Sequence, residues 1–148
     1  MNIVRSFWEL RVYMTARQAC ADIFHMTRKF PKEERYSLTD QIRRASRATK
    51  ALIGEAWGRR RYRDSFAHKL VEALSEANEV QSWIDDAEDC AYVDPSWAND
   101  MRDRWEVIAS SISRMIDRAD LFCPNSPKTD YSNTIQEDSP ESEWFIDS

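Results

Sequence analysis

Apolar residues recur every three or four positions along most of this chain, and few residues interrupt the pattern. Only two glycines and five prolines occur among 148 residues. This spacing places apolar side chains on one face of an α-helix, whereas the alternating Val-, Ile- and Thr-rich runs typical of β-strands are missing. A chain of this length can bury its own core as one domain without metal or disulfide support. The sequence therefore predicts an all-α protein.

Caps and helix breakers divide the pattern into four segments. Phe30-Pro31 ends the first, because proline disfavours a helical conformation in the residue before it. Asp94-Pro95 opens the last, with proline in the first helical position. The predicted helices, with their candidate caps, are Phe7 to Lys29, Ser37 or Thr39 to Gly58, Asp64 or Ser65 to Cys90, and Asp94 to Leu121.

Each predicted helix has a single apolar face, so we expect the four to pack as an antiparallel up-down-up-down four-helix bundle. Tryptophan is frequent, and four of the six tryptophans lie on or beside these faces, where packing is the default role. Trp83 is displaced from its apolar line and is also a candidate for a subunit interface. The predicted core is Leu10, Met14, Cys20, Ile23, Phe24, Thr27, Leu38, Ile42, Ala45, Thr49, Leu52, Ile53, Ala56, Phe66, Leu70, Ala73, Leu74, Ala77, Val80, Ile84, Ala87, Met101, Trp105, Ile108, Ile112, Met115, Ile116 and Ala119, with Trp8, Trp83 and Trp97 beside it.

The net charge of −5 is distributed unevenly. Residues 123–148 contain one lysine and six acids, which leaves residues 1–122 with 20 basic and 20 acidic side chains. This Pro-, Ser- and Asp-rich end has the composition of a disordered acidic tail. We therefore expect a four-helix bundle over 1–122 and a disordered tail over 123–148.

Basic residues concentrate in the second predicted helix and the turn after it, and over residues 43–63 Glu55 is the only acid among eight Lys and Arg residues. At about 100° per residue, Arg43, Arg47 and Lys50 fall on one stripe with Gly54 and Arg61, away from the core face. Guanidinium groups pair with phosphates and an indole can stack on an unpaired base, which favours RNA or single-stranded DNA as the partner. The alternative is a solvated, salt-bridged surface. The candidate nucleic-acid-binding residues are Arg43, Arg44, Arg47, Lys50, Trp57, Arg59, Arg60, Arg61 and Arg63.

The chain has little catalytic or metal-binding equipment. The nearest imitation of a di-iron bundle site is Asp22-x-x-His25 with Glu72, Glu76 and Glu79, which lacks the Glu-x-x-His pairs, so a di-metal carboxylate enzyme is a remote alternative. No Gly-rich phosphate loop or nucleophile elbow occurs. We expect a non-enzymatic protein without cofactor.

The cellular compartment of the protein is predicted from its cysteines and its hydropathy. Three separated cysteines suit a reducing compartment, with Cys20 and Cys90 as small helix fillers and Cys123 free in a loop. No apolar stretch is as long as that of a signal peptide or a membrane span. These features predict a cytoplasmic protein without membrane contact.

The predicted tail contains an apolar triplet, Trp144-Phe145-Ile146, framed by acids. Such a pattern is typical of a docking motif, so a protein-directed adaptor is a further alternative. The tail can also fold back on the arginines of residues 59–61 and compete with phosphates. A purely solubilising end is the simplest interpretation.

Four stretches of the chain carry a resemblance to a known family. They are SFWELRVYMTARQACADIFHMTRKFP, EERYSLTDQIRRAS, IGEAWGRRRYRDSF and EANEVQSWIDDAEDCAYVD. Together they resemble one bacterial family of four-helix bundles, the 23S ribosomal RNA intervening-sequence proteins, which includes the accessory variability determinants of diversity-generating retroelements. The resemblance covers about residues 6–121, and the neutral body favours the general family over the retroelement branch. It implies a homo-oligomer, a ring of five subunits, with nucleic acid and a reverse transcriptase as possible partners.

Overall fold

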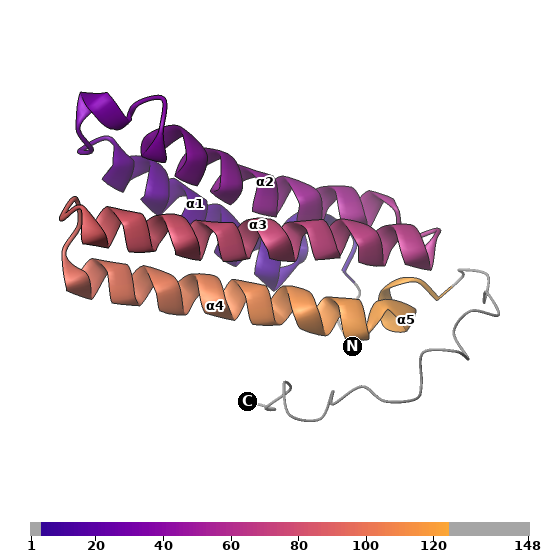
Figure 1. The fold of residues 1–148 in the computed structure, drawn as a ribbon. Helices are drawn as coiled ribbons and strands as arrows, with labels where there is room; N and C mark the ends of the chain where they lie inside the picture. The colour runs from indigo at the N-terminus through magenta and orange to yellow at the C-terminus, as the bar shows by residue number, and fades with distance from the viewer. Residues whose placement is uncertain (1–3, 125–148) are drawn as a thin grey trace, which may run out of the picture.

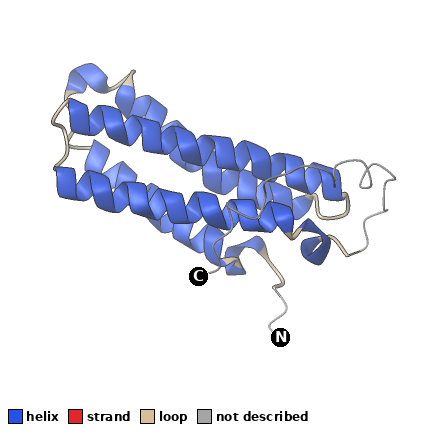
Figure 2. Cartoon of the chain, turned by 60° about the horizontal axis from the view of Figure 1, so that its bottom comes forward, coloured by secondary structure: helices blue, strands red, loops and turns tan. Residues whose placement is uncertain are grey.

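The computed structural model describes residues 4–124, and every regular element within them is helical (Figures 1 and 2). The predicted disordered tail lies outside the described residues, apart from Cys123 and Pro124. The elements are η1 (Phe7–Glu9), α1 (Arg11–Thr27), η2 (Lys32–Glu34), α2 (Leu38–Gly58), α3 (Arg63–Asp89), α4 (Pro95–Asp117) and α5 (Ala119–Phe122).

The four long helices run alternately up and down and pack side by side, which confirms the predicted four-helix bundle (Figure 1). Contacts are most numerous between α2 and α3, and far fewer join α1 to α4. The bundle therefore has one loosely closed side, where α1 faces α4. Within residues 4–124, no helix is both long enough and apolar enough to cross a membrane.

The core is built from the predicted apolar faces. Trp105, Phe66 and Ile23 are among the largest side chains that are completely buried. Small residues such as Ala16 and Ala77 are also fully buried, which lets neighbouring helices approach closely. The match between periodicity and burial shows that apolar burial, at about 25 cal/mol per Å², orders these helices.

Three residues predicted to pack in or beside the core, Met14, Trp8 and Cys90, are exposed, and the breaks between helices explain them. A fourth, Phe24, is half-buried and lies outside the core cluster. Met14 is 57% exposed, because Leu10 is the extended N-cap of α1 and four-residue steps counted from it do not follow one helix face. Trp8 is 63% exposed on η1, outside the regular helix. Cys90, predicted to be a filler on the third helix, follows the last residue of α3 and is exposed. Cys123, predicted to be free in a loop, directly follows α5 and is buried. The first and last predicted helices are thus each split into two.

Glu34 performs the capping role that the sequence assigned to Ser37 or Thr39. Ser37 is the N-cap of α2, but its side chain makes no capping hydrogen bond. Thr39 lies in the first turn of α2 and its side chain is buried. The Glu34 carboxylate instead accepts hydrogen bonds from the Leu38 amide at 3.1 Å and from the Tyr92 hydroxyl at 3.0 Å. The hydrogen bond from the Tyr92 hydroxyl to Glu34 raises the pKa of Tyr92 to about 12. One carboxylate therefore ties the start of α2 to the loop between α3 and α4.

The start of α3 was also misplaced, while the start of α4 was predicted correctly. The N-cap of α3 is Tyr62, so Asp64 and Ser65 lie within the first turn. Asp94 is the N-cap of α4, and Pro95 occupies the first helical position as expected.

The end of α3 is closed by a left-handed residue that is not glycine. Ala91 has a φ of 59°, and its amide donates to the Glu88 carbonyl while the Tyr92 amide donates to the Ala87 carbonyl. This pair of bonds is the Schellman pattern, in which glycine is preferred because a Cβ atom strains the left-handed conformation.

We predict that Ala91→Gly raises the free energy of unfolding by about 0.5–1 kcal/mol, the strain relieved minus the extra chain entropy lost by glycine. Urea unfolding followed by circular dichroism measures this change as a higher midpoint with an unchanged slope. The control is Ala51→Gly at an exposed position inside α2, which should lower the same free energy by about 1 kcal/mol. Equal losses at the two positions would contradict the assignment of strain at Ala91.

Candidate nucleic-acid interface

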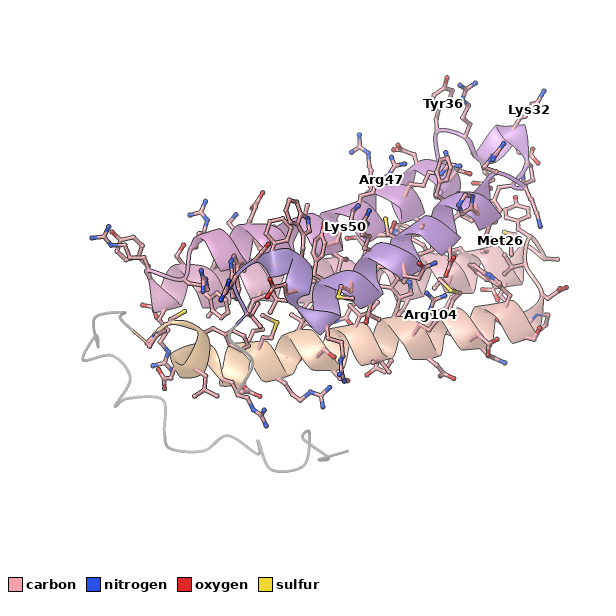
Figure 3. All side chains as sticks on the ribbon, turned by 180° about the vertical axis from the view of Figure 1, so that it is seen from behind. Met26, Lys32, Tyr36, Arg47, Lys50 and Arg104 are labelled. Carbon is pink, nitrogen blue, oxygen red and sulfur yellow. The ribbon has the colours of Figure 1, made fainter. Side chains whose placement is uncertain are left out.

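Two arginines of α2 lie over the aromatic ring of Phe24 on α1. The Arg43 guanidinium lies 4.7 Å from the centroid of the Phe24 ring, and the Arg47 guanidinium lies 5.9 Å from it. Arg28 follows α1 and is close enough for its charge to act on Arg43. We call Arg28, Arg43, Arg47 and Phe24 the basic cluster. It spans the antiparallel pair α1 and α2, and Figure 3 labels Arg47 and the neighbouring Lys50 on this side of the molecule.

Arg43 is the fixed member of the basic cluster. Its Nε donates to the Thr27 hydroxyl at 2.8 Å, and that hydroxyl donates to the Phe24 carbonyl at 3.0 Å. Burial lowers the pKa of Arg43, and the charges of Arg47 and Arg28 lower it further. An arginine stays protonated at neutral pH even so. The result is a positioned guanidinium beside two like charges.

The carboxylates of α1 and α2 turn away from the basic cluster to other partners. Asp22 binds Arg104 of α4 at 2.6 Å, and Glu55 binds Lys69 of α3 at 3.5 Å. Within residues 4–124, no ion pair joins a carboxylate to Arg28, Arg43, Arg47 or Lys50. The charges of this cluster are therefore not compensated by the described part of the protein.

Arg44 does not belong to the basic cluster. Its Nε binds Asp40 at 3.1 Å, one helical turn earlier, and its side chain is 76% exposed. This is the solvated, salt-bridged arrangement that the sequence offered as the alternative, and it applies to this one arginine of α2.

The predicted continuous stripe from Arg43 to Arg61 is interrupted. A Cβ atom added to Gly54 would lie 3.5 Å from the Phe7 ring, so η1 covers α2 at this position. The Phe7 ring therefore covers Gly54, and α2 has no open surface at this position. The basic residues form two groups along α2, the basic cluster before Gly54 and the turn at residues 59–63 after it.

The turn between α2 and α3 carries the second basic group. The Arg59 guanidinium donates to the Ser65 hydroxyl at 3.3 Å, and Arg61 lies 5.8 Å from the Tyr62 ring centroid. Arg63 binds Asp120 of α5 at 2.9 Å. Arg59 and Arg61 are exposed, so the outer corner of this turn presents cations to solvent.

Trp57 is a packing residue in this turn. The indole is 9% exposed, and the Arg60 guanidinium covers it at 3.4 Å from the ring centroid while donating to the Trp57 carbonyl at 2.9 Å. The structure thus places Trp57 inside the bundle, not at the border of the basic stripe, and leaves it no open face for a base. Its contribution is to hold Arg60.

Sequence reasoning missed Phe24 as the platform of the cluster and Arg28 as its third cation. Phe24 lies on α1 and Arg28 directly follows it, and only the antiparallel pairing of α1 with α2 brings them to Arg43. The available signal was the pair Arg28-Lys29 just before Phe30-Pro31, which any helical hairpin places opposite the first half of the following helix.

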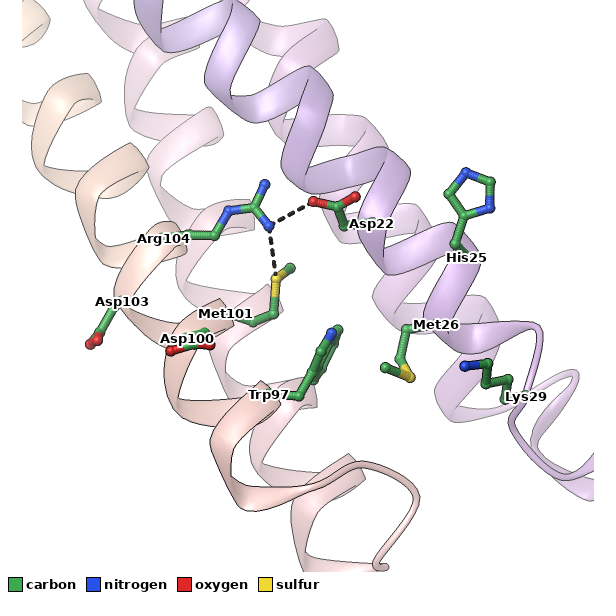
Figure 4. Close-up of a pocket in the computed structure, with 9 residues that line it drawn as sticks. All are labelled: Asp22, His25, Met26, Lys29, Trp97, Asp100, Met101, Asp103 and Arg104. Atoms are coloured by element: carbon green, nitrogen blue, oxygen red, sulfur yellow. Dashed lines mark hydrogen bonds and ion pairs between the residues drawn. The ribbon is translucent and has the colours of Figure 1, made fainter.

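A separate hollow of about 630 Å³ lies between α1 and α4 (Figure 4). Figure 4 shows Arg104 reaching from α4 to Asp22 on α1, while His25 extends away from both. Among residues 4–124, no three His, Cys, Asp or Glu side chains are arranged to hold a metal ion. The Asp22 and His25 pattern considered for a di-metal site therefore does not assemble with Glu72, Glu76 and Glu79.

One comparison with known proteins gives a family. The family model described as 23S rRNA-intervening sequence protein matches residues 8–116, which is most of the chain and runs from η1 nearly to the end of α4. No curated protein matches the chain.

Proposed function

The chain belongs to the 23S rRNA-intervening sequence protein family, and we propose that it is a non-catalytic protein that binds nucleic acid through the basic cluster. The observation that carries this proposal is the placement of Arg43 and Arg47 over Phe24, with Arg28 close enough for its charge to act on Arg43. None of the three forms an ion pair with a carboxylate in the described residues. Mutual repulsion raises the free energy of such a group, and a bound phosphate lowers it.

The geometry favours contact with the sugar-phosphate backbone. Guanidinium groups bind phosphate oxygens through paired hydrogen bonds. The Phe24 ring is already covered by Arg43 and Arg47, and Trp57 by Arg60, so neither aromatic offers a platform for base stacking. We therefore expect binding that depends on charge and shape and discriminates weakly between sequences.

The exposed cations of the turn extend the proposed surface. Arg47 and Arg59 are twelve residues apart on and just after α2, a separation of about 18 Å along a helix axis. The basic cluster and the turn can therefore contact different phosphates of one strand or helix.

We predict that affinity for a structured RNA falls steeply with salt. If Arg28, Arg43 and Arg47 each contact a phosphate, the slope of log K against log salt should be about −2 for single strands and closer to −3 for a duplex. Fluorescence polarisation of a labelled RNA hairpin from 50 to 300 mM KCl measures it, with a single-stranded DNA of the same length for comparison. A slope near zero, or no binding at the lowest salt, would contradict the proposal.

The proposal extends to assembly. A ring of identical subunits would present several copies of the basic cluster to one nucleic acid and increase the overall affinity without new contacts. The pentamer and the reverse transcriptase partner implied by the resemblance stay predictions, as does the interface role of Trp83, which is half-buried in the single chain. Light scattering coupled to size-exclusion chromatography tests the first.

A further inference from the structure

A smaller groove of about 230 Å³ lies on the loosely closed side of the bundle, between α1 and α4 and beside α5. Val12, Ile108 and Met115 line it and are nearly or completely buried. Val107 also lines it and is 56% exposed, so apolar surface continues from the groove to the solvent.

The charged residues that line this groove are cationic. Arg11 and Arg114 both line it, and no acidic residue does. The Arg114 guanidinium donates to the Ser111 hydroxyl at 3.3 Å, and neither arginine forms an ion pair with a carboxylate in the described range 4–124. The larger hollow in Figure 4 differs, because Asp22, Asp100 and Asp103 line it beside its cations. An acidic apolar ligand thus fits the smaller groove better.

The chain itself contains a segment of matching chemistry. Residues 141–147 read ESEWFID, with Trp144, Phe145 and Ile146 between three acids. No other part of the proposed function uses this segment. Its apolar triplet complements the buried wall of the groove, and its acids complement Arg11 and Arg114.

We propose that residues 141–147 dock into the groove between α1 and α4 of their own chain. Phe122 of α5 forms one wall of the groove, so the chain leaves the described structure next to the proposed site. Nineteen residues lie between Pro124 and Trp144, and about 3.3 Å per extended residue gives ample length for the chain to return. Tethering then makes even a weak contact well populated.

Disulfide cross-linking in the full-length chain tests this docking. With the exposed Cys90 changed to serine, Ser142→Cys is combined with Ser111→Cys inside the groove. A disulfide requires Cα atoms within about 7 Å, so docking should make this pair close at least about tenfold faster than a matched control. That control is Ser142→Cys with Ser110→Cys, an exposed neighbour about 100° round α4. Peptide mapping after mild oxidation identifies each bond.

Further variants make each outcome decisive. Thr15→Cys on the α1 side of the groove replaces Ser111→Cys if the latter disturbs folding, and Trp144→Ala should slow cross-linking to the control rate. Arg59→Cys tests docking at the alternative site, the arginines of residues 59–61. This turn lies near the point where the chain leaves the described structure, since the charges of Arg60 and Arg63 act on Cys123. Equal rates at positions 110 and 111, faster closure with Arg59→Cys, or bonds between chains would each overturn the proposal. The assay contains no nucleic acid, so its result is independent of RNA binding.

Discussion

Replacing Arg43 and Arg47 together with glutamate should abolish binding of the RNA hairpin at 50 mM KCl. The double change converts two of the three cations of the basic cluster into acids, so the cluster would repel the phosphates that it is proposed to attract. For Arg47→Glu alone we expect a loss of about tenfold or more, which corresponds to about 1.4 kcal/mol of binding free energy. The salt dependence of the remaining binding should become shallower by about one unit of slope.

The single variant Arg47→Glu separates an effect on binding from an effect on folding. Arg43 is bonded to the buried Thr27, so its loss also affects packing, whereas Arg47 is exposed and makes no hydrogen bond in the described structure. Arg118→Glu, an exposed change of equal charge at the end of α4, is the matched control and should alter affinity less than about twofold. Equal losses from Arg47→Glu and Arg118→Glu would show that only net charge matters and would remove the basic cluster from the proposal.

Periodicity predicted the bundle well, because one physical requirement, burial of an apolar face, determines both the sequence pattern and the packing. Ile42, Leu70 and Ile112 lie on the predicted faces and are completely or nearly completely buried. The errors occur where the chain leaves a regular helix. Leu10 and Cys90 are flanking residues with non-helical or terminal backbone, and counting by 3.6 does not apply to them.

The candidate site was predicted only in part, because half of its geometry comes from contacts between helices. The sequence places Arg43 and Arg47 on one stripe of α2, but the positions of Phe24 and Arg28 depend on how α1 pairs with it. Trp57 could have been assigned correctly, since it follows the core residue Ile53 by four positions. The contact of Phe7 with Gly54 carries no sequence signal beyond the missing side chain.

Trp105→Ala should have the largest effect on stability of any truncation to alanine in the described residues, lowering the free energy of unfolding by about 3–5 kcal/mol. Trp105 is the largest side chain with no exposed surface, and α4 contributes it to a core shared by all four long helices. Alanine would leave a cavity that rigid helices cannot refill. A small domain has only about 5–15 kcal/mol in total, so the unfolding midpoint in urea should fall sharply.

Two other tryptophan variants show whether volume or hydrogen bonding determines this loss. The Trp105 Nε1 atom is buried without a hydrogen-bond partner in the described structure, so Trp105→Phe removes volume but no bond and should cost less than half as much as Trp105→Ala. Trp8→Ala, at a residue that is 63% exposed, should change the free energy of unfolding by less than about 1 kcal/mol. Similar losses for Trp8→Ala and Trp105→Ala would contradict the central position of Trp105, because only a buried indole leaves a cavity when it is truncated.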